Sequence, residues 1–344
     1  MAVTARDVAR AAGVSPATVS LVFRNKPGVG TRTREHVFAV AEELGYEYQG
    51  TASPDNRHAL QLVVYKSHGK VVGETAFFGE LIHGVQSATY ARGFGQLLIS
   101  YFYEGENNTE QLRALRSSKC DGIILLATEL NAPGVRAIRR LGVPVVLLDS
   151  WFPTKDLDAV IIDNQGGAFN AVDHLVAAGH RDIGYLHSKV RIRNFLERAD
   201  GFRQACQLLV DRHYDCAART VEVGASASEA YADMVAWLNG NPHVPTAFFA
   251  DNDLIAVGAI GALVEAGYRV PQDVSVIGFD NVPTVELGAL GLTTMDVPKA
   301  RLGALAVERL AKIIGQGTRT ETVRISVLPT VVSRDSVVPP RPEQ

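Results

Sequence analysis

From about residue 60 onward, short apolar runs alternate with longer segments in which apolar residues recur every three or four positions. The apolar runs have the sequences LQLVVY, GQLLIS, GIILLA, PVVLLD, AVIID, IGYLH, TAFFA and VSVIGFD. Between them lie amphipathic segments such as FGELIHGVQSATYARG, NAVDHLVAAGH and DLIAVGAIGALVEAG. Continuous apolar strands separated by helices are typical of parallel sheets that helices cover on both faces. The pattern therefore predicts an α/β fold with parallel sheets for this part of the chain.

This α/β part has about 280 residues, which is enough for two lobes, since domains typically have about 100–200 residues. Breaks in the pattern at IIDNQGG and GLTTMDVP indicate that the chain crosses between the lobes there, and it returns near TETVRIS. We expect lobe 1 to contain about residues 60–160 and 291–321, and lobe 2 about residues 161–290 and 322–336. The Pro-rich residues 337–344 form a tail without heptads, which argues against a C-terminal tetramer coil.

The first 46 residues have a purely helical pattern. Thr4 and Asp7 match the capping pattern that precedes a helix, and Ser15-Pro16 is a second helix start. Gly13 between these two signals tolerates the positive φ of a tight turn, and a third helix is expected from about residue 33 to 44. Two small-residue helices around such a turn indicate a helix-turn-helix domain at residues 1–46. The alternative, a generic three-helix cap, is disfavoured by the short AGVS turn.

Residues 47–59, EYQGTASPDNRHA, are rich in turn and loop formers. This composition predicts a flexible linker between the helical domain and the α/β part.

Charge bears on possible partners. The 344-residue chain has a net charge of −3, so any contact with nucleic acid must come from a local basic patch. Four of the six basic residues among the first fifty, Arg24, Lys26, Arg32 and Arg34, follow the second predicted helix. This cluster fits phosphate contacts, although a solvated charge run is the alternative.

Several function classes have no support in the sequence. The three cysteines fit neither a disulfide framework nor a metal motif, and we interpret them as reduced, buried thiols. The N-terminus lacks the apolar stretch of a secretory signal, and no run of 18 apolar residues could span a membrane. No catalytic constellation or metal spacing is evident. We therefore expect a cytoplasmic protein that is not an enzyme and has no cofactor, no metal and no membrane contact.

The segments TARDVARAAGVSPATVS and TRTREHVFAVAEELGY resemble the DNA-binding headpiece of the lactose-repressor (LacI/GalR) family of bacterial transcription regulators. The resemblance continues along nearly the whole chain. It implies an all-α helix-turn-helix headpiece followed by a two-lobed core like a periplasmic sugar-binding protein. It also implies a ligand-responsive, sequence-specific transcription regulator, with a repressor as the favoured form. A solute-binding protein or an α/β enzyme on the same scaffold is the alternative.

The resemblance places Pro16, Ala17 and Leu21 at positions that read bases in the family. None of the three offers a polar side chain, so Leu21 is expected to make apolar contact, for example with a thymine methyl group. Further candidates for DNA contacts share a polar side chain or a place near a helix start, and are Thr4, Ser15, Thr18, Ser20, Arg24, Thr33 and Arg34. The linker lacks the Pro-Asn start and the leucine wedge of the hinge helix that the family inserts into the minor groove.

Polar residues at predicted strand ends are candidates for a ligand site, because such sheets bind ligands beyond the carboxyl ends of their strands. Asp149, Asn252, Asp253 and Asp280 occupy such ends, although each alone could be a helix cap. Arg198 matches the family's Arg-x-x-Gly-aromatic signature, whose arginine reaches the effector. The resemblance also implies effector contacts for the following residues: Asp149, Asn252, Asp280, Phe77 and Phe78. Asn194 and Trp151 are further candidates from nearby loops, and helix core is the alternative for Phe77.

Carboxylates, an amide, an arginine and an aromatic face suit a neutral polyhydroxylated ligand, so a sugar is the favoured effector. A nucleobase, a nucleoside or an amino sugar stays open. A single helix-turn-helix reads only half of a palindromic operator in double-stranded DNA, so we expect a homodimer. The sequence does not indicate whether the effector releases DNA or promotes binding.

Overall fold

The computed structural model describes residues 3–23, 29–44, 46, 58–73, 76–105, 108–153, 157–211, 217–283, 287–317 and 321–341. The chain divides into two compact units, one formed by residues 1–58 with residues 93–96 and the other by the remaining residues. Most of the predicted linker, residues 47–57, lies outside the described residues, as does Cys216.

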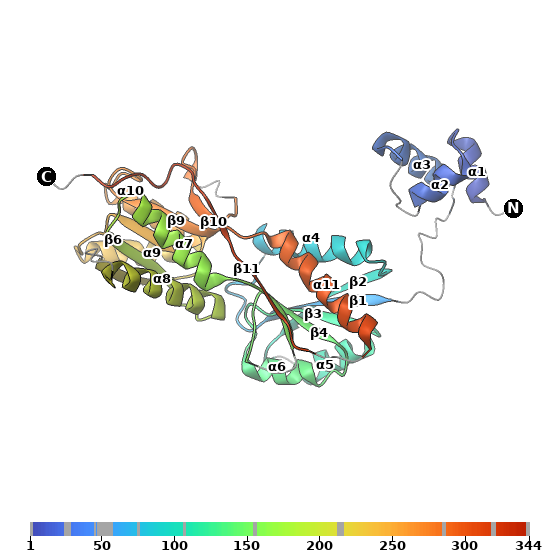
Figure 1. Ribbon diagram of the computed structural model, residues 1–344, viewed down its shortest axis with the longest axis horizontal. Coiled ribbons are helices and arrows are strands. Elements are labelled where there is room, and N and C mark those ends of the chain that lie inside the picture. Colours follow the sequence, from blue (N-terminus) through green and yellow to red (C-terminus); the bar gives the residue numbers. More distant parts are fainter. Residues whose placement is uncertain are drawn as a thin grey trace. The chain divides into compact units, whose positions relative to one another are not determined.

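The N-terminal unit contains three helices, α1 (Ala5–Ala11), α2 (Pro16–Phe23) and α3 (Thr31–Glu43) (Figure 1). The predicted starts of α1 and α2 are confirmed, and Gly13 between them has a φ of +64°. The Asp7 carboxylate accepts hydrogen bonds from the Thr4 backbone N–H (2.9 Å) and hydroxyl (2.5 Å), which fixes the first turn of α1. At α2 the cap residue is itself the acceptor, because the Ser15 hydroxyl oxygen accepts the Thr18 backbone N–H at 3.0 Å.

The three helices share one small apolar core. Its buried residues are Val8, Ala9, Ala12, Val19, Val22, Phe23, Val37, Val40 and Ala41. The Phe23 ring stacks on Tyr46 with a centroid distance of 5.7 Å, which ties the chain after α3 to the end of α2. The side chains of α2 that do not belong to this core therefore lie on the surface of the helix. The predicted helix-turn-helix is confirmed.

Lobe 1 of the larger unit is a six-stranded sheet in the order β11-β5-β4-β3-β1-β2. Its strands are β1 (Ala59–Lys66), β2 (Gln96–Tyr103), β3 (Gly122–Leu126), β4 (Val145–Leu148), β5 (Asp158–Ile162) and β11 (Arg324–Val327). Figure 1 shows α4 (Ala76–Ala91) and α11 (Lys299–Gln316) on one face of this sheet, and α5 (Asn108–Ser117) and α6 (Ala132–Arg139) on the other.

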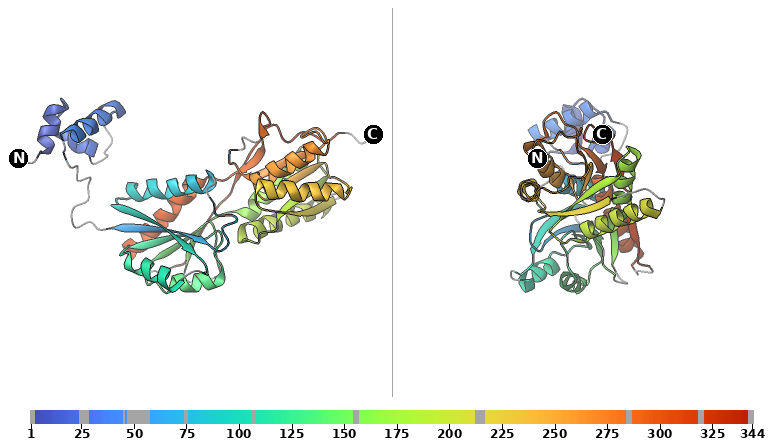
Figure 2. Two further views of the ribbon diagram at one scale, coloured as in Figure 1. Left: turned by 180° about the vertical axis from the view of Figure 1, so that it is seen from behind. Right: turned by 90° about the vertical axis from the view of Figure 1, so that its left-hand side faces the viewer.

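Lobe 2 repeats the plan with the strand order β12-β10-β9-β8-β6-β7. Its strands are β6 (Asp182–Ser188), β7 (Ala217–Val223), β8 (Ala247–Ala250), β9 (Ser275–Asp280), β10 (Thr293–Asp296) and β12 (Thr330–Val332). The helices pair as α7 (Asn164–Ala177) with α8 (Arg193–Asp211), and as α9 (Ala227–Asn239) with α10 (Asp253–Glu265). The view from behind has α9 and α10 in front of the sheet (Figure 2, left).

All eight predicted apolar runs form strands, and the central ones are buried on both faces as a parallel sheet requires. β3, for example, pairs in parallel with both β1 and β4. The strand β7 was not among the predicted runs. The fold class, a helical headpiece with a two-lobed parallel α/β core, is confirmed.

The boundaries between the lobes differ from the prediction in two places. β10 was expected in lobe 1, but it pairs in parallel with β9 of lobe 2. β11 was expected in lobe 2, but it pairs in parallel with β5 of lobe 1. The chain therefore crosses between the lobes after β5, after β10 and after β11. After the second and third crossings the chain adds β11 beside β5 and β12 beside β10, each at the edge of its sheet.

The predicted tail is also partly wrong, because residues up to 338 pack on lobe 2. The Val338 backbone oxygen accepts hydrogen bonds at His180 Nε2 (2.9 Å) and the Ser275 hydroxyl (3.2 Å). Ser336 is buried and donates to the Val276 oxygen at 2.6 Å. These contacts explain His180, which is buried as a structural residue of lobe 2.

The α4–α11 contact gives a prediction on stability. A Cβ placed on Gly84 of α4 would lie 2.1 Å from the Ala300 backbone oxygen, whereas one on Gly79 of the same helix meets nothing within 4 Å. We expect Gly84→Ala to lower the free energy of unfolding by about 3 kcal/mol, because a backbone contact cannot give way. Gly79→Ala should raise it by about 0.5 kcal/mol through helix propensity. Urea unfolding of the two variants measures this difference, and equal effects would contradict the contact.

Candidate functional site: a helix surface and an inter-lobe cavity

The surface of α2 presents the residues that the sequence places at base-reading positions. Pro16 and Ala17 in its first turn and Leu21 one turn later are exposed, and Leu21 belongs to no core cluster. Ser15 is also exposed, and Thr18 and Ser20 are half-buried. This face of α2 is thus an apolar strip with hydroxyl groups beside it.

The remaining DNA-contact candidates have additional roles or lie elsewhere. Thr4 is exposed and caps α1. Arg34 Nη1 donates to the Val22 backbone oxygen at 3.2 Å, so its guanidinium also holds the end of α2 against α3. Thr33 is half-buried in the first turn of α3. Arg24 lies outside the described residues.

A cavity of about 420 Å³ lies between the two lobes at the carboxyl ends of their strands. All seven residues predicted to contact an effector line it: Phe77, Phe78, Asp149, Asn194, Arg198, Asn252 and Asp280. Lobe 1 contributes the first three of these, and lobe 2 contributes the other four. The structure thus brings together residues that lie up to 203 positions apart in the chain.

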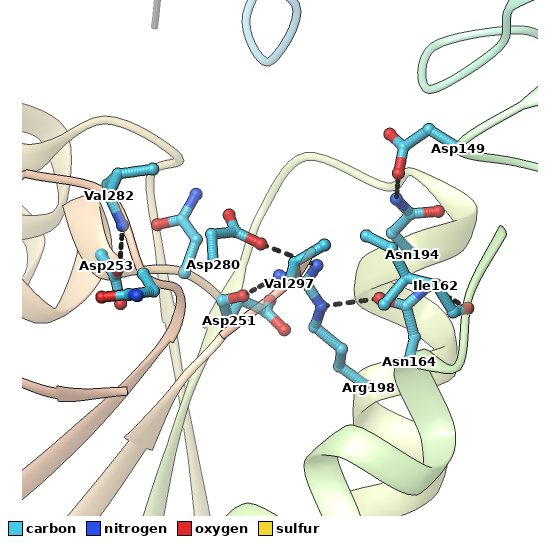
Figure 3. Close-up of polar contacts among 12 residues, drawn as sticks. Asp149, Ile162, Asn164, Asn194, Arg198, Asp251, Asp253, Asp280, Val282 and Val297 are labelled. Carbon is cyan, nitrogen blue, oxygen red and sulfur yellow. Dashed lines mark hydrogen bonds and ion pairs between the residues drawn. The ribbon is translucent and has the colours of Figure 1, made fainter. Parts of the chain in front are cut away.

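Asp149 is the polar centre of the lobe 1 wall. It follows β4, is 1% exposed, and accepts the Thr128 hydroxyl at 2.5 Å. Its other oxygen accepts Asn194 Nδ2 of α8 at 3.1 Å, which is a hydrogen bond between the lobes (Figure 3). Asp149 has a φ of +68° and Asp280 a φ of +106°, conformations that are uncommon for residues other than glycine. Strain of this kind is concentrated at functional sites.

Arg198 is the polar centre of the lobe 2 wall. Its guanidinium, on α8, donates from Nε to Asn164 Oδ1 (2.9 Å), from Nη1 to the Asp251 backbone oxygen and from Nη2 to Asp280 Oδ1 (3.2 Å) (Figure 3). The guanidinium carbon lies 3.6 Å from the centroid of the Phe279 ring. These contacts fix the arginine in one orientation beside the Asp280 carboxylate. The pair can present donors and an acceptor to the same bound molecule.

For Asn252, the helix-cap interpretation and the cavity interpretation both hold, whereas Asp253 is the first residue of α10. The Asn252 side chain accepts the Ile255 backbone N–H at 2.8 Å and caps α10 while it lines the cavity. Asp253 accepts the Thr294 hydroxyl (2.5 Å) and the Val282 N–H (2.8 Å), so both of its oxygens are already engaged. Asp253 therefore supports the site, and Asn252 retains an amide group at the cavity.

The other walls are mainly apolar. Phe77 and Phe78 are 7% and 6% exposed, and their rings meet edge to face at 5.0 Å. Both interpretations of Phe77 thus apply, because it is buried in α4 and also lines the cavity. Sequence reasoning missed further lining residues from loops and from α8, including Lys70, Val71, Thr128, Ile192 and Phe195. Thr128 follows β3, so the strand-end rule could have found it.

Trp151, the remaining candidate, is not among the residues that line the cavity. Its indole N–H donates to Glu197 Oε1 at 2.7 Å. Its ring lies 4.4 Å from the guanidinium carbon of Arg193 and 3.3 Å from that of Arg324. Trp151 and Arg324 belong to lobe 1 and the other two to α8, so this cluster joins the lobes beside Arg198.

The electrostatics of Asp149 give a testable pH dependence. Burial raises its pKa from 3.8 to about 7, although the Thr128 hydrogen bond and the Arg198 charge oppose the rise. The folded state therefore binds a proton that the unfolded state has released between these two pH values, and this stabilisation is lost as the pH rises through about 7. Burial raises the pKa of Asp253 to about 7 and that of Asp280 in the same direction.

We expect Asp149→Asn to remove the part of this dependence that Asp149 causes. The melting temperature of the variant relative to the wild type should rise by about 5 °C between pH 5 and pH 8. Thermal denaturation at both pH values measures the difference. A constant difference between the two proteins would show that Asp149 is ionised throughout.

Within the described ranges, no three His, Cys, Asp or Glu side chains form a group that could hold a metal ion. No described helix combines the length and the apolar character needed to cross a membrane. Neither Cys120 nor Cys206 forms a disulfide with a described residue, and Cys206 is buried.

Two family profiles match the chain. Residues 4–48 match the profile described as bacterial regulatory proteins, lacI family, and residues 172–337 match the periplasmic binding protein-like domain. Among curated relatives, the HTH-type transcriptional repressor PurR of Mannheimia succiniciproducens is 33% identical over 339 residues, which cover 97% of this chain and 98% of the relative. The PurR repressor of Haemophilus influenzae strain Rd is 30% identical over 343 residues, which cover 97% of this chain and 98% of that protein.

Two solved structures are similar along almost their whole length. One is a complex of the transcriptional regulator CelR with cellobiose, with a TM-score of 0.69 and 29% identity, covering 97% of this chain and 99% of that one. The other is the lac repressor dimer bound to operator and the anti-inducer ONPF, with a TM-score of 0.70 and 26% identity, covering 98% and 100%.

Proposed function

The chain belongs to the lacI family of bacterial regulatory proteins and is a DNA-binding transcriptional regulator, and from this premise we propose that a small polar effector in the inter-lobe cavity controls operator binding. The curated relatives named above are transcriptional repressors, and we propose repression for this chain also. Membership of this family disfavours the two alternatives, a solute-binding protein and an α/β enzyme.

One observation carries the proposal: polar side chains of both lobes line the same inter-lobe cavity. Asp149 is supplied by lobe 1, and Arg198 and Asp280 by lobe 2. A ligand that contacts both sets has a different affinity for each relative position of the lobes. Such a difference in affinity is the physical requirement for control by a ligand.

We propose a sugar as the effector. Asp149 and Asp280 offer acceptors to hydroxyl groups, and the Asn252 amide nitrogen and the Arg198 guanidinium offer donors. Phe77 and Phe78 offer apolar faces for the C–H side of a sugar ring. The similar CelR structure holds cellobiose, which is consistent with this class. The extensive apolar lining also suits a flat nucleobase, which is therefore included in the test.

The proposed mechanism uses the three chain segments that connect the lobes. Closure of the lobes around the effector changes the Asp149–Asn194 hydrogen bond and the Trp151 cluster, since both join lobe 1 to α8. In a dimer, closure of the lobes changes the spacing of the two headpieces and hence their fit to the two half-sites of the operator. A coupling free energy of about 1–3 kcal/mol gives a useful response.

We propose that DNA contacts come from the exposed face of α2, with Leu21, Pro16 and Ala17 at the bases. Ser15, Thr18, Ser20, Thr4, Thr33, Arg24 and Arg34 are the proposed polar contacts. Because phosphate contacts release counterions, operator affinity should fall steeply with salt. A cytoplasmic location is the corresponding proposal for a protein that acts on the chromosome.

We propose that the chain acts as a homodimer, with the edge strand β2 in the interface. One face of β2 carries Ile99, Tyr101 and Tyr103, which are 46%, 53% and 48% exposed. An exposed apolar edge strand is a surface that proteins usually cover. The similar lac repressor structure is a dimer on its operator.

We expect Tyr101→Asp to raise the dimer dissociation constant by at least about tenfold, because a charge placed in a buried interface costs several kcal/mol. Leu208→Asp on α8, where the leucine is 37% exposed, is the matched control and should leave dimerisation unchanged. Sedimentation velocity across a concentration series measures both variants. A wild-type monomer, or equal effects of the two variants, would contradict the assigned interface.

The test of the proposed function is a binding screen on the full chain. Mono- and disaccharides, amino sugars, nucleosides and nucleobases are added in turn, and melting temperature and calorimetric binding are recorded. We expect one class to bind and to change operator affinity. Turnover of a bound compound would overturn the proposal in favour of an enzyme, and binding that leaves operator affinity unchanged would overturn the control mechanism.

A further inference from the structure

The loop between β1 and α4 forms part of the cavity wall without regular secondary structure. Its residues Lys70, Val71 and Gly73 line the cavity. The loop contributes Lys70 to the lobe 1 part of the cavity lining, and Arg198 belongs to the lobe 2 part. Neither the strand-end rule nor the resemblance pointed to this loop.

A single carboxylate holds this loop. Glu129 lies after β3 and is 4% exposed. Its Oε2 accepts the backbone N–H groups of Ser67 (3.0 Å), His68 (3.1 Å) and Gly69 (2.8 Å). Its Oε1 accepts those of Val71 and Val72, each at 2.9 Å, and lies 3.3 Å from His68 Nδ1.

These five hydrogen bonds determine both the charge of Glu129 and the shape of the loop. Burial alone would raise the pKa of Glu129, but the backbone N–H groups of Val72, Val71, Gly69 and His68 outweigh it and lower the pKa. A buried carboxylate that is ionised in this way needs all of its donors. Among the described residues, no strand or helix accepts these N–H groups in place of Glu129.

We propose that Glu129 is the positioning residue of a second specificity wall, in which the loop at residues 67–73 presents Lys70 and Val71 to the effector. This inference rests on the proposed function, since it takes the effector to occupy the inter-lobe cavity. Lys70 donates to an electron-rich group of the effector from lobe 1. Glu129 does not touch the effector and acts through the loop.

A purely structural role for Glu129 makes a different prediction. Every hydrogen bond that the described residues donate to its carboxylate comes from residues 67–72, and none joins it to the rest of the sheet. Loss of the carboxylate should therefore loosen the loop and weaken effector binding while the lobe stays folded. If Glu129 were a general scaffold residue, its replacement would lower the melting temperature and the operator affinity along with the effector affinity.

The experiment compares three variants of the full chain. Glu129→Gln removes the charge and replaces one acceptor oxygen by a donor. Glu104→Gln is the matched control, a half-buried lobe 1 glutamate that accepts Asn131 Nδ2 at 2.7 Å and has no bond to the loop. Lys70→Met keeps the length of the side chain without its charge. Amide hydrogen exchange of residues 67–72 is measured without any effector, and calorimetry uses the compound that binds the wild type in the screen.

We expect Glu129→Gln to accelerate exchange of these amides by at least about tenfold and to weaken effector binding by a similar factor, because buried donors lose their acceptor. Lys70→Met should weaken effector binding without changing exchange, and Glu104→Gln should change neither. Operator affinity without effector should stay at the wild-type value in all three variants.

Unchanged exchange in Glu129→Gln overturns its positioning role, whether or not an effector is found. Faster exchange with unchanged effector affinity overturns the loop as a specificity wall. If no compound binds the wild type, the proposed function and the role of Lys70 fall together, while the exchange result still decides the role of Glu129.

Discussion

Replacing Leu21 with glutamate will weaken operator binding by at least about a hundredfold, because a like charge placed against DNA costs several kcal/mol. Leu21 is 37% exposed on α2 and packs in no core cluster, so the headpiece should fold normally. Leu44 follows α3 in the same unit and is 38% exposed. Leu44→Glu therefore makes the same chemical change at an equally exposed position and should cost less than about threefold.

Titration of a labelled operator with each variant, at two salt concentrations, measures the effect. Circular dichroism confirms that both variants retain the wild-type helix content. Equal losses for the two substitutions would mean that the surface of α2 is not the part of the headpiece that enters the groove.

Replacing Arg198 with alanine will abolish the effector response by weakening effector binding at least about a hundredfold, since truncating one partner of a buried charge pair costs several kcal/mol. Arg198 is 2% exposed, and its loss leaves the Asp280 carboxylate without its partner. Operator affinity without effector should stay within about threefold of the wild type, because the headpiece is a separate compact unit.

Two further variants serve as controls for this test. Arg198→Ala combined with Asp280→Asn removes the unpaired charge and keeps the test valid if the single variant unfolds. Arg203→Ala on the same helix removes an exposed arginine that pairs with Asp200 and should change nothing. A variant at Arg198 that keeps the wild-type response would show that the effector binds elsewhere.

The sequence was sufficient for the headpiece because its signals are local. Thr4 with Asp7, Gly13, and Ser15 with Pro16 each act within four residues, and the structure uses all of them as caps or turns. The cavity residues Asp149, Asn252 and Asp280 were predictable for another reason. Parallel strands place their carboxyl ends at one edge of a sheet, so a polar residue after an apolar run has a defined location.

The parts that could not be predicted depend on distant partners. β11 and β12 are short strands separated by Leu328 and Pro329, and nothing local shows that they belong to different sheets. The chain end packs on lobe 2 because His180 and Ser275, which lie much earlier in the sequence, hydrogen-bond to the Val338 backbone oxygen. Glu129 resembles any glutamate near a strand end until its five backbone donors, about sixty residues earlier, are placed around it.

The central claim is that occupation of the inter-lobe cavity changes the affinity of the headpieces for operator DNA. Its most direct test is the affinity of the full-length protein for its operator, isolated by selection from genomic fragments, with and without a saturating cavity ligand. The account predicts a change of at least about fivefold, matched by an equal change in ligand affinity when operator is present. The same operator affinity with an empty and an occupied cavity would contradict it.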